Sequence, residues 1–329
     1  MLSRTADHLF WMARYMERAE NTARMLDVNY QTSLLPQSAA EAEQGWRGLL
    51  SISELTWSFS QKYTEVTPGN VMNFMVRDEA NPSSIVSCLR AARENARAVR
   101  GALTTEVWET QNQTWLEFMR LLKDSSFERD PSSLFEWVKF RSHLSRGVTV
   151  GTMLQDEALH FLRIGTFLER ADNTARLLDV KFQALAGGDY FGPADGGVPP
   201  RDGPATPQEI DFYHWSAILR SVSGFEIYRK VYRNVIRPEK VAELLILRPD
   251  MPRSLAACMN DLGANLEMVA NQHSSETLRR AGRLRADLKY GRIDEILATG
   301  LHAYLTQFLD RVNDIGVGIS RDFLVPMAA

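Results

Sequence analysis

The feature that most constrains the fold of this chain is an internal duplication. Residues 8–28 and 160–180 match at an offset of 152, with eleven of twenty-one positions identical. Residues 81–99 and 251–269 match at an offset of 170 and share Pro, Ser, Cys, Asn and Val. Self-similarity of this kind indicates that one structural unit is used more than once.

The duplication predicts two related halves, residues 1–151 and 152–329, that share one core and form one compact unit. The offset grows by 18 between the two matches, and residues 187–204 lie in that interval with six glycines and four prolines. This composition cannot sustain a helix and is typical of a long loop. We therefore expect a surface loop inserted in the second half.

Hydrophobic spacing predicts an all-α fold, a helical bundle in which the two halves are related by a pseudo-two-fold axis. Apolar residues recur at three- and four-residue steps in most segments. Asn81-Pro82, Asp130-Pro131 and Thr206-Pro207 each combine an N-cap residue with proline in the first turn, which predicts three helix starts. The best candidate for a strand is 147–151, which is only a turn in length.

Composition excludes several classes of protein. The net charge is −3 over 329 residues, so there is no basic surplus that would indicate a nucleic-acid partner. No apolar run approaches the ~20 residues needed to cross a membrane, and the N-terminus has no signal-peptide core. The two cysteines are too few for a disulfide framework, so we expect a cytoplasmic protein.

The duplicated helix carries a polar face of mixed charge. On a helical wheel, Glu20, Asn21 and Arg24 lie within about 60° of Glu17, and Arg18 lies at the edge of this face. The polar face matches between the two copies better than much of the apolar face does, which indicates a specific contact. The candidate functional residues are Glu17, Arg18, Glu20, Asn21, Arg24, Glu169, Arg170, Asp172, Asn173 and Arg176.

Two interpretations of this face stay open. The two helices can pack near the two-fold axis, with Glu17 and Arg18 pairing with Glu169 and Arg170 in a closed interface. Alternatively, the two faces form the walls of a groove in which arginines bind a carboxylate or phosphate. The location of these four side chains distinguishes the two.

Other reactive residues give weaker indications. Glu157 and His160 have the spacing of a di-metal bundle, but Thr5 stands at the matching position of the first copy, so we expect no metal. Cys88 and Cys258 occupy matching positions on apolar faces and are expected to be buried. The chain has no phosphate-binding, dinucleotide-binding or serine-hydrolase motif, and no cofactor is expected.

The paired Glu-Arg segments resemble the signature of the bacterial alpha-E family, which is named for such a motif. The resemblance extends over nearly the whole chain. The segments that carry it are residues 17–28, 93–97, 136–139, 147–153 and 169–176. It implies an all-helical protein that occurs beside, or fused to, circularly permuted ATP-grasp proteins. Transglutaminase-like peptidases are also neighbours, and the shared system is thought to make or modify peptides.

The resemblance and the residues together support three hypotheses. The first is a non-catalytic partner or scaffold of an ATP-grasp amide ligase that presents a peptide substrate. The second is an enzyme of peptide modification with its active site between the two Glu-Arg helices. The third is a structural homo-oligomer without a cofactor site.

Overall fold

The computed structural model describes residues 1–36, 38–124, 126–186 and 207–324. Within these ranges the ordered elements are α-helices and one 3-10 turn, without a β-strand, which confirms the predicted all-α class. No helix among the described residues has the length and apolarity to cross a membrane. The predicted loop 187–204 lies outside the described residues.

The helices up to residue 152 are α1 (Ser3–Ser33), α2 (Ala39–Ile52), α3 (Thr56–Ser60), α4 (Pro68–Val76), α5 (Ile85–Ala98), α6 (Thr105–Lys123), α7 (Ser126–Arg129) and α8 (Pro131–Thr152), with the 3-10 turn at Arg100–Ala102. Those that follow are α9 (Glu157–Ala186), α10 (Pro207–Ser221), α11 (Phe225–Tyr232), α12 (Pro238–Ile246), α13 (Leu255–Met268), α14 (Ser275–Tyr290), α15 (Ile293–Thr299) and α16 (Leu301–Phe323).

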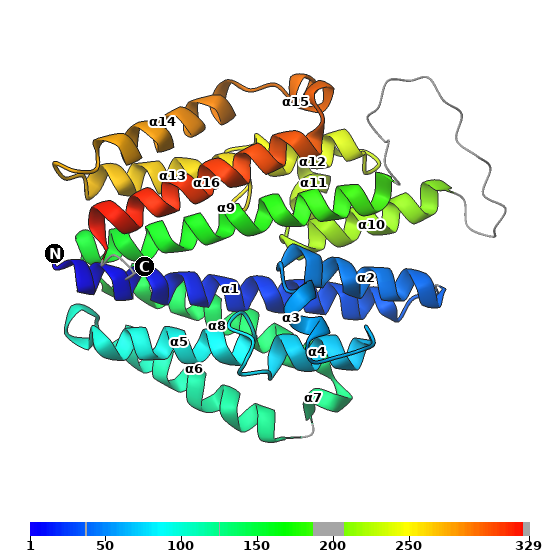
Figure 1. The fold of residues 1–329 in the computed structure, drawn as a ribbon, viewed down its shortest axis with the longest axis horizontal. Helices are drawn as coiled ribbons and strands as arrows, with labels where there is room; N and C mark the ends of the chain where they lie inside the picture. Colours follow the sequence, from blue (N-terminus) through cyan, green and yellow to red (C-terminus); the bar gives the residue numbers. More distant parts are fainter. Residues whose placement is uncertain (37, 125, 187–206, 325–329) are drawn as a thin grey trace.

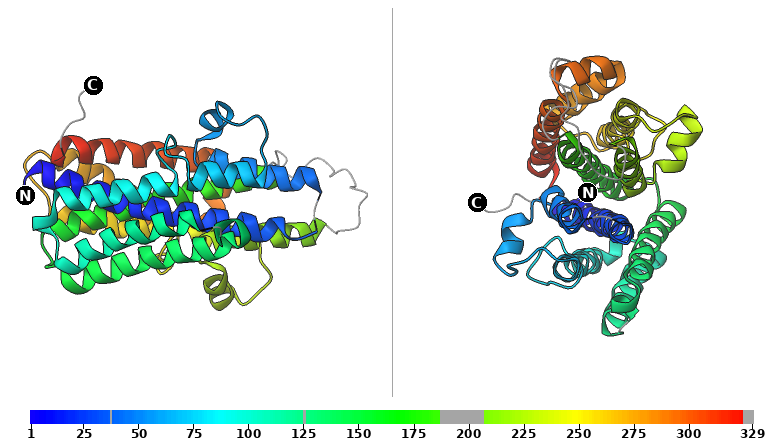
Figure 2. Two further views of the ribbon diagram at one scale, coloured as in Figure 1. Left: turned by 90° about the horizontal axis from the view of Figure 1, so that it is seen from below. Right: turned by 90° about the vertical axis from the view of Figure 1, so that its right-hand side faces the viewer.

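Helices α1 and α9 form the centre of the bundle. They lie side by side along the long axis of the molecule (Figure 1) and share the most extensive contact between any two helices. Helices α5 and α8 pack against α1, while α13 and α16 pack against α9. The end-on view shows these two groups on opposite sides of the central pair (Figure 2). The contact between α1 and α9 therefore lies in the interior of the bundle.

The helix starts follow capping rules, with one correction. Asp130 caps α8 by accepting a hydrogen bond from the backbone N–H of Ser133, as predicted. The prediction at Asn81 is wrong, because α5 begins at Ile85 and is capped by Ser84. Asn81 instead orders the preceding turn, where its amide donates to the carbonyl of Phe74. The predicted cap at residue 206 lies outside the described residues.

Residues 147–151, the best strand candidate although only a turn in length, lie inside α8, in agreement with the predicted all-α fold. Ser145 and Thr149 are buried one turn apart, and each continues the helical contact face of α8. A strand of these residues would need a partner strand for its backbone groups, whereas within α8 their N–H groups pair with the preceding turn. Packing of the helix face therefore overrides the β-branched residues.

Helices α1 and α9 approach each other closely at Gly165. A Cβ atom at this position would lie 2.3 Å from the carbonyl oxygen of Phe10 and 3.3 Å from the Cβ of Ala13. Gly165 is buried in the interior of α9, where glycine costs stability relative to alanine. The missing side chain is thus what allows the two central helices to touch.

We expect Gly165→Ala to destabilise the protein by about 1–3 kcal/mol, because the added methyl group must displace the backbone of α1. Gly147→Ala is the matched control, since Gly147 is exposed in α8 and no atom lies within 4 Å of a Cβ there. That change should stabilise the protein by about 0.5–1 kcal/mol. Urea unfolding of both variants measures the difference, and equal stabilities would contradict the close contact.

Candidate functional site

The two Glu-Arg segments face each other across the contact between α1 and α9. Arg170 donates two hydrogen bonds to the carboxylate of Glu17, from Nε to Oε1 at 2.9 Å and from Nη2 to Oε2 at 2.9 Å. Arg18 does the same to Glu169, at 2.6 Å from Nε to Oε1 and 3.1 Å from Nη2 to Oε2. Both pairs are bidentate, the geometry in which guanidinium and carboxylate bind best. These four side chains therefore form an interface between the two helices.

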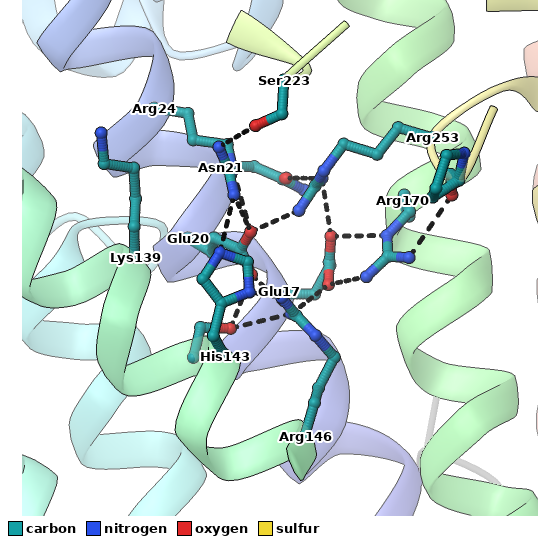
Figure 3. A network of polar contacts seen from close by, with 12 residues as sticks. Glu17, Glu20, Asn21, Arg24, Lys139, His143, Arg146, Arg170, Ser223 and Arg253 are labelled. Carbon is teal, nitrogen blue, oxygen red and sulfur yellow. Dashed lines mark hydrogen bonds and ion pairs between the residues drawn. The ribbon is translucent and has the colours of Figure 1, made fainter. Parts of the chain in front are cut away.

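Glu17 has further partners from other parts of the chain (Figure 3). Nη1 of Arg253, in the segment just before α13, donates to Oε1 at 2.9 Å. Nη1 of Arg146, from α8, donates to Oε2 at 3.1 Å. Glu17 is only 1 % exposed, and its two oxygens receive donors from three separate elements. The carboxylate therefore joins α1 to α8, α9 and the start of α13.

Glu20 lies one turn further along α1 and is fully buried. Its Oε1 accepts from Nε of Arg24 at 2.8 Å and from Arg253. Its Oε2 accepts from the hydroxyl of Ser142 at 2.7 Å and from Nη1 of Arg146 at 2.5 Å. The same two arginines, Arg146 and Arg253, therefore serve both glutamates.

We call Glu17, Glu20 and the guanidinium groups around them the central network. Its cations outnumber its anions by two, because four arginines surround two carboxylates. Those arginines are Arg24, Arg146, Arg170 and Arg253. A buried charge without a counter-charge is costly, so a surplus of this size is unusual for a purely structural cluster.

The charges of the arginines keep the carboxylates ionised. Burial alone would raise the pKa values of Glu17 and Glu20. The charges of Arg170 and Arg253 outweigh this effect at Glu17 and lower its pKa. The charges of Arg253 and Arg146 do the same at Glu20. Burial likewise opposes ionisation of Glu169, yet Arg14 and Arg18 lower its pKa to about 2. None of these carboxylates holds a proton near neutral pH.

His143 lies at the outer edge of the central network. Nη2 of Arg24 lies 3.2 Å from its Nε2, and Nη2 of Arg146 lies 2.7 Å from its Nδ1. A neutral imidazole has a single acceptor nitrogen, so only one of these guanidinium groups can donate to it at a time. Burial lowers the pKa of His143, and although Glu20 opposes this effect, Arg146 adds to it. The ring is therefore neutral at pH 7.

The remaining candidate residues do not all join the central network. The side-chain oxygen of Asn21 accepts from Arg253 at 2.8 Å, whereas its buried nitrogen has no partner among the described residues. Arg176 binds Asp172 at 2.8 Å and also contacts Glu54, in a separate cluster. Asn173 is half-buried and makes no side-chain hydrogen bond within the described part of the chain.

Sequence reasoning missed the residues that other elements bring to the network: Ser142, His143, Arg146 and Arg253. Arg253 had a detectable signal, because Ser83 stands at its position in the first copy of the duplicated segment. A cation that replaces a small polar residue in one copy alone marks a local difference between the halves. Arg146 gave no comparable signal, since it lies in a helix outside the two matched segments.

A cavity of about 360 Å³ adjoins the central network between α1, α8, α9 and α13. Its charged lining consists of Glu17, Arg146, Arg163, Arg170 and Asp261, and its apolar lining includes Met12, Met16, Leu159, Leu162 and Phe167. Arg146 and Arg170 therefore have one side on the closed interface and the other on an open space. The structure contains elements of both sequence-based interpretations, the interface and the groove.

The weaker candidates, the two cysteines and the pair Glu157 and His160, make contacts of a structural kind. Cys88 and Cys258 are fully buried, as predicted, and burial raises the pKa of each thiol to about 12. Nδ1 of His160 lies 2.8 Å from Oδ1 of Asn265, while Glu157 contacts the N-terminal amine. The described residues contain no group of three or more His, Cys, Asp or Glu placed to hold a metal ion.

The fold and the site together define an all-helical module organised by a Glu-Arg motif. The chain belongs to the Alpha-E family, described as a predicted alpha-helical domain with a conserved ER motif, whose family model matches residues 1–324. Uncharacterized proteins of Mycobacterium bovis and Mycobacterium tuberculosis are 25 % identical to it over 335 residues. The match covers 93 % of this chain, which spans about a third (35 %) of the length of those relatives. No solved structure matches the chain.

We expect Glu17→Gln to destabilise the protein by about 3–5 kcal/mol, because it leaves three guanidinium groups short of negative charge in the interior. Glu276→Gln is the control, since this exposed glutamate on α14 pairs with Arg279 and Arg280, and surface pairs contribute little. Chemical denaturation followed by circular dichroism measures both. A Glu17→Gln variant as stable as the control would contradict the role of the network.

Acid should destabilise the protein partly through Glu169. Its pKa is lowered from 4.5 to about 2, so its contribution is fully present above about pH 4.5 and disappears as the pH falls toward 2. The shift corresponds to at most about 3 kcal/mol. Urea unfolding between about pH 6 and 2.5 should show this loss in the unmodified protein and a smaller loss in Glu169→Gln.

Asp172→Asn is the control for this pH dependence. Burial raises the pKa of Asp172, although Arg176 opposes the effect, so its folded form binds a proton more readily than its unfolded form. Without that carboxyl group, the loss of unfolding free energy in acid should be unchanged or slightly larger. If Asp172→Asn reduced the acid-induced loss of stability as much as Glu169→Gln does, Glu169 would not be its specific source.

Proposed function

We propose that this chain is a non-catalytic helical partner of an ATP-grasp-type amide ligase in a peptide-synthesis or peptide-modification system, where it holds substrate for the ligase. The observation that carries the proposal is the state of the Glu-Arg motif. Its carboxylates are buried, ionised and occupied by arginines, while the arginine surplus faces a cavity. Such a site is suited to binding an anion and poorly suited to transferring a proton.

We also infer that the two halves, residues 1–151 and 152–329, are arranged about a pseudo-two-fold axis. The reciprocal pairs support it, because Glu17 binds Arg170 while Arg18 binds Glu169, as in an isologous contact. A second pair of contacts supports it equally: Nδ1 of His8 lies 2.7 Å from Asn95, and Nδ1 of His160 lies 2.8 Å from Asn265. These residues stand at matching positions of the duplication.

The alternative, an enzyme with its active site between the two Glu-Arg helices, has less support. General acid or base catalysis works best with a pKa near the working pH. The pKa values of Glu17, Glu20 and Glu169 are all lowered, and those of the two cysteines are raised. The glutamates and cysteines are therefore not tuned for such chemistry, and Asp172, whose pKa is raised by burial, lies in the separate cluster with Arg176 and Glu54. His143 is neutral and lies at the network edge, but it contacts only arginines within it.

An exposed apolar strip on α8 offers a surface for a protein partner. Phe140 is 67 % exposed, and Leu144 and Val150 are also exposed on this helix. Apolar side chains grouped in this way are typical of interaction surfaces. Val150 lines the cavity but lies about 80° around α8 from Phe140, so a partner that covers both residues would extend from the strip toward the cavity.

The partner in this proposal follows from the resemblance to the alpha-E family. An Alpha-E module beside or fused to a circularly permuted ATP-grasp protein would act together with it, and a transglutaminase-like peptidase is a further candidate. The mycobacterial relatives are about three times as long as the region they share with this chain, as expected of a module that works beside other domains. A location in the cytoplasm fits the ATP requirement of such a ligase.

We expect the chain to co-purify with the circularly permuted ATP-grasp protein of its own organism and to increase the ligase activity on peptide. Phe140→Glu should weaken the complex at least tenfold by placing a charge in the interface. Val317→Glu is the control, because Val317 is exposed to the same degree on α16, on the other side of the bundle. Calorimetric titration of the two proteins measures the affinity.

The proposal fails if no complex forms and ligase turnover is the same with and without the chain. Light scattering of the chain alone tests the remaining hypothesis, a structural homo-oligomer. A stable oligomer that Phe140→Glu dissociates would mean that the strip on α8 binds a second copy of this chain instead of a ligase.

A further inference from the structure

The cavity beside the central network has a surplus of positive charge on its wall. Arg146 and Arg170 both bind Oε2 of Glu17, at 3.1 and 2.9 Å, so one carboxylate oxygen serves two guanidinium groups. Both arginines also line the cavity, and Glu17 is shared with Arg253 as well. Arg146 also donates to Glu20 and Ser142, and Arg170 donates to the carbonyl oxygen of Pro252, but Nε of Arg146 has no acceptor among the described residues, so the wall retains an unused N–H donor.

Arg163 adds a third cation to this wall. It is half-buried, lines the cavity, and makes no hydrogen bond or ion pair with any residue that the structure describes. Its counterpart in the duplicated helix is Trp11, which packs on Tyr15 at 5.5 Å and holds Arg14 over its ring at 4.9 Å. The duplicated position thus carries a packed ring in the first copy and five unused N–H donors in the second.

Beyond its charged groups the cavity has a mixed lining, in which polar side chains accompany the apolar ones: Ser142, Ser145, Thr149, Thr166 and Asn265. The side chains of Met12, Met16, Leu159, Leu162 and Phe167 form one wall. Asp261 is exposed and lines the cavity near Asn265 on α13. The volume of about 360 Å³ lies at the lower end of small-molecule sites, which span ~300–1,000 Å³. The site fits a small ligand with an anionic end and an apolar body.

The neighbouring network favours an anion in this space. Burial lowers the pKa of Arg253, and the charges of Arg170 and Arg24 add to this effect against those of Glu17 and Glu20. An anion in the cavity would offset the surplus that the four arginines of the network share. Asp261 disfavours a doubly charged phosphate there, whereas it can accept a hydrogen bond from an amide or amino N–H group.

We propose that this cavity binds the carboxylate end of a small peptide-like ligand with an apolar side chain. The carboxylate lies against Arg163 and the cavity-facing N–H groups of Arg146 and Arg170, and the side chain lies against Met12, Met16 and Leu162. Asp261 accepts the backbone N–H of the ligand. This inference names the substrate class of the proposed function, on which its biological role rests, but binding itself needs only this chain.

Calorimetric titration of the purified chain with three probes tests the proposal. N-acetyl-L-leucine carries the carboxylate, the apolar side chain and the N–H group; N-acetyl-L-leucinamide is its neutral match; and inorganic phosphate is an anion without an apolar body. We expect saturable binding of N-acetyl-L-leucine and at least tenfold weaker binding of the other two.

Arg163→Gln should weaken the binding of N-acetyl-L-leucine about tenfold or more, and Arg163→Lys should weaken it less. Both variants should fold, because Arg163 makes no hydrogen bond or ion pair with a described residue and has only a longer-range electrostatic interaction with Asp261, and circular dichroism verifies this. Arg283→Gln is the matched control, an exposed arginine on α14 without an ion pair among the described residues, and should leave the affinity unchanged.

Three results would overturn the proposal: no binding of N-acetyl-L-leucine, equal binding of the amide or of phosphate, or unchanged affinity in Arg163→Gln. Since the titration contains no ligase, a failure here is distinct from a failure of the proposed partnership. Binding without complex formation would leave a carboxylate-binding protein that does not serve an ATP-grasp enzyme.

Discussion

Glu17 lies at the centre of the bundle, where its buried carboxylate depends on hydrogen-bond donors from other elements of the chain. Its oxygens accept from Arg146 on α8, Arg170 on α9 and Arg253 before α13. Moving an ionised carboxylate into the interior costs several kcal/mol unless its partners are placed well. The relative positions of four elements therefore depend on one side chain of α1, and displacement of any of them leaves a charge buried without its partners.

This arrangement specifies alignment more than it adds stability. Replacing a buried ion network with well-packed apolar residues is often neutral or stabilising, so the free energy of folding comes chiefly from the apolar contacts. Those contacts tolerate small sliding motions of one helix along another, whereas a bidentate pair does not. We infer that Glu17–Arg170 and Arg18–Glu169 fix the register of α1 against α9, and that Gly165 allows the close approach which the pairs require.

The predictability of these features from sequence depended on whether their signal was local. The helices follow from spacing and from caps such as Asp130, and the Glu-Arg faces follow from comparing two segments of one chain. Arg146 and Arg253 bind Glu17 from 129 and 236 positions away, a relation that no local pattern records. Residues 147–151, too short to predict as a strand, belong to α8 because a packed helix face outweighs the preference of valine for strands. Arg163 could be noticed only as a mismatch with Trp11, and its place beside a cavity required the structure.

The separation of Glu17 from Arg253 has a consequence for the biosynthesis of the chain. A ribosome adds roughly 5–20 residues per second, so the 236 positions between them take on the order of 10–50 s. For the first 129 of those positions the carboxylate of Glu17 has none of the arginines that bind it in the folded protein, whereas Glu20 already has Arg24 on the same helix. The charged side chains of α1 are hydrated at that stage, and Glu17 and Glu20 become enclosed once Arg253 has been made.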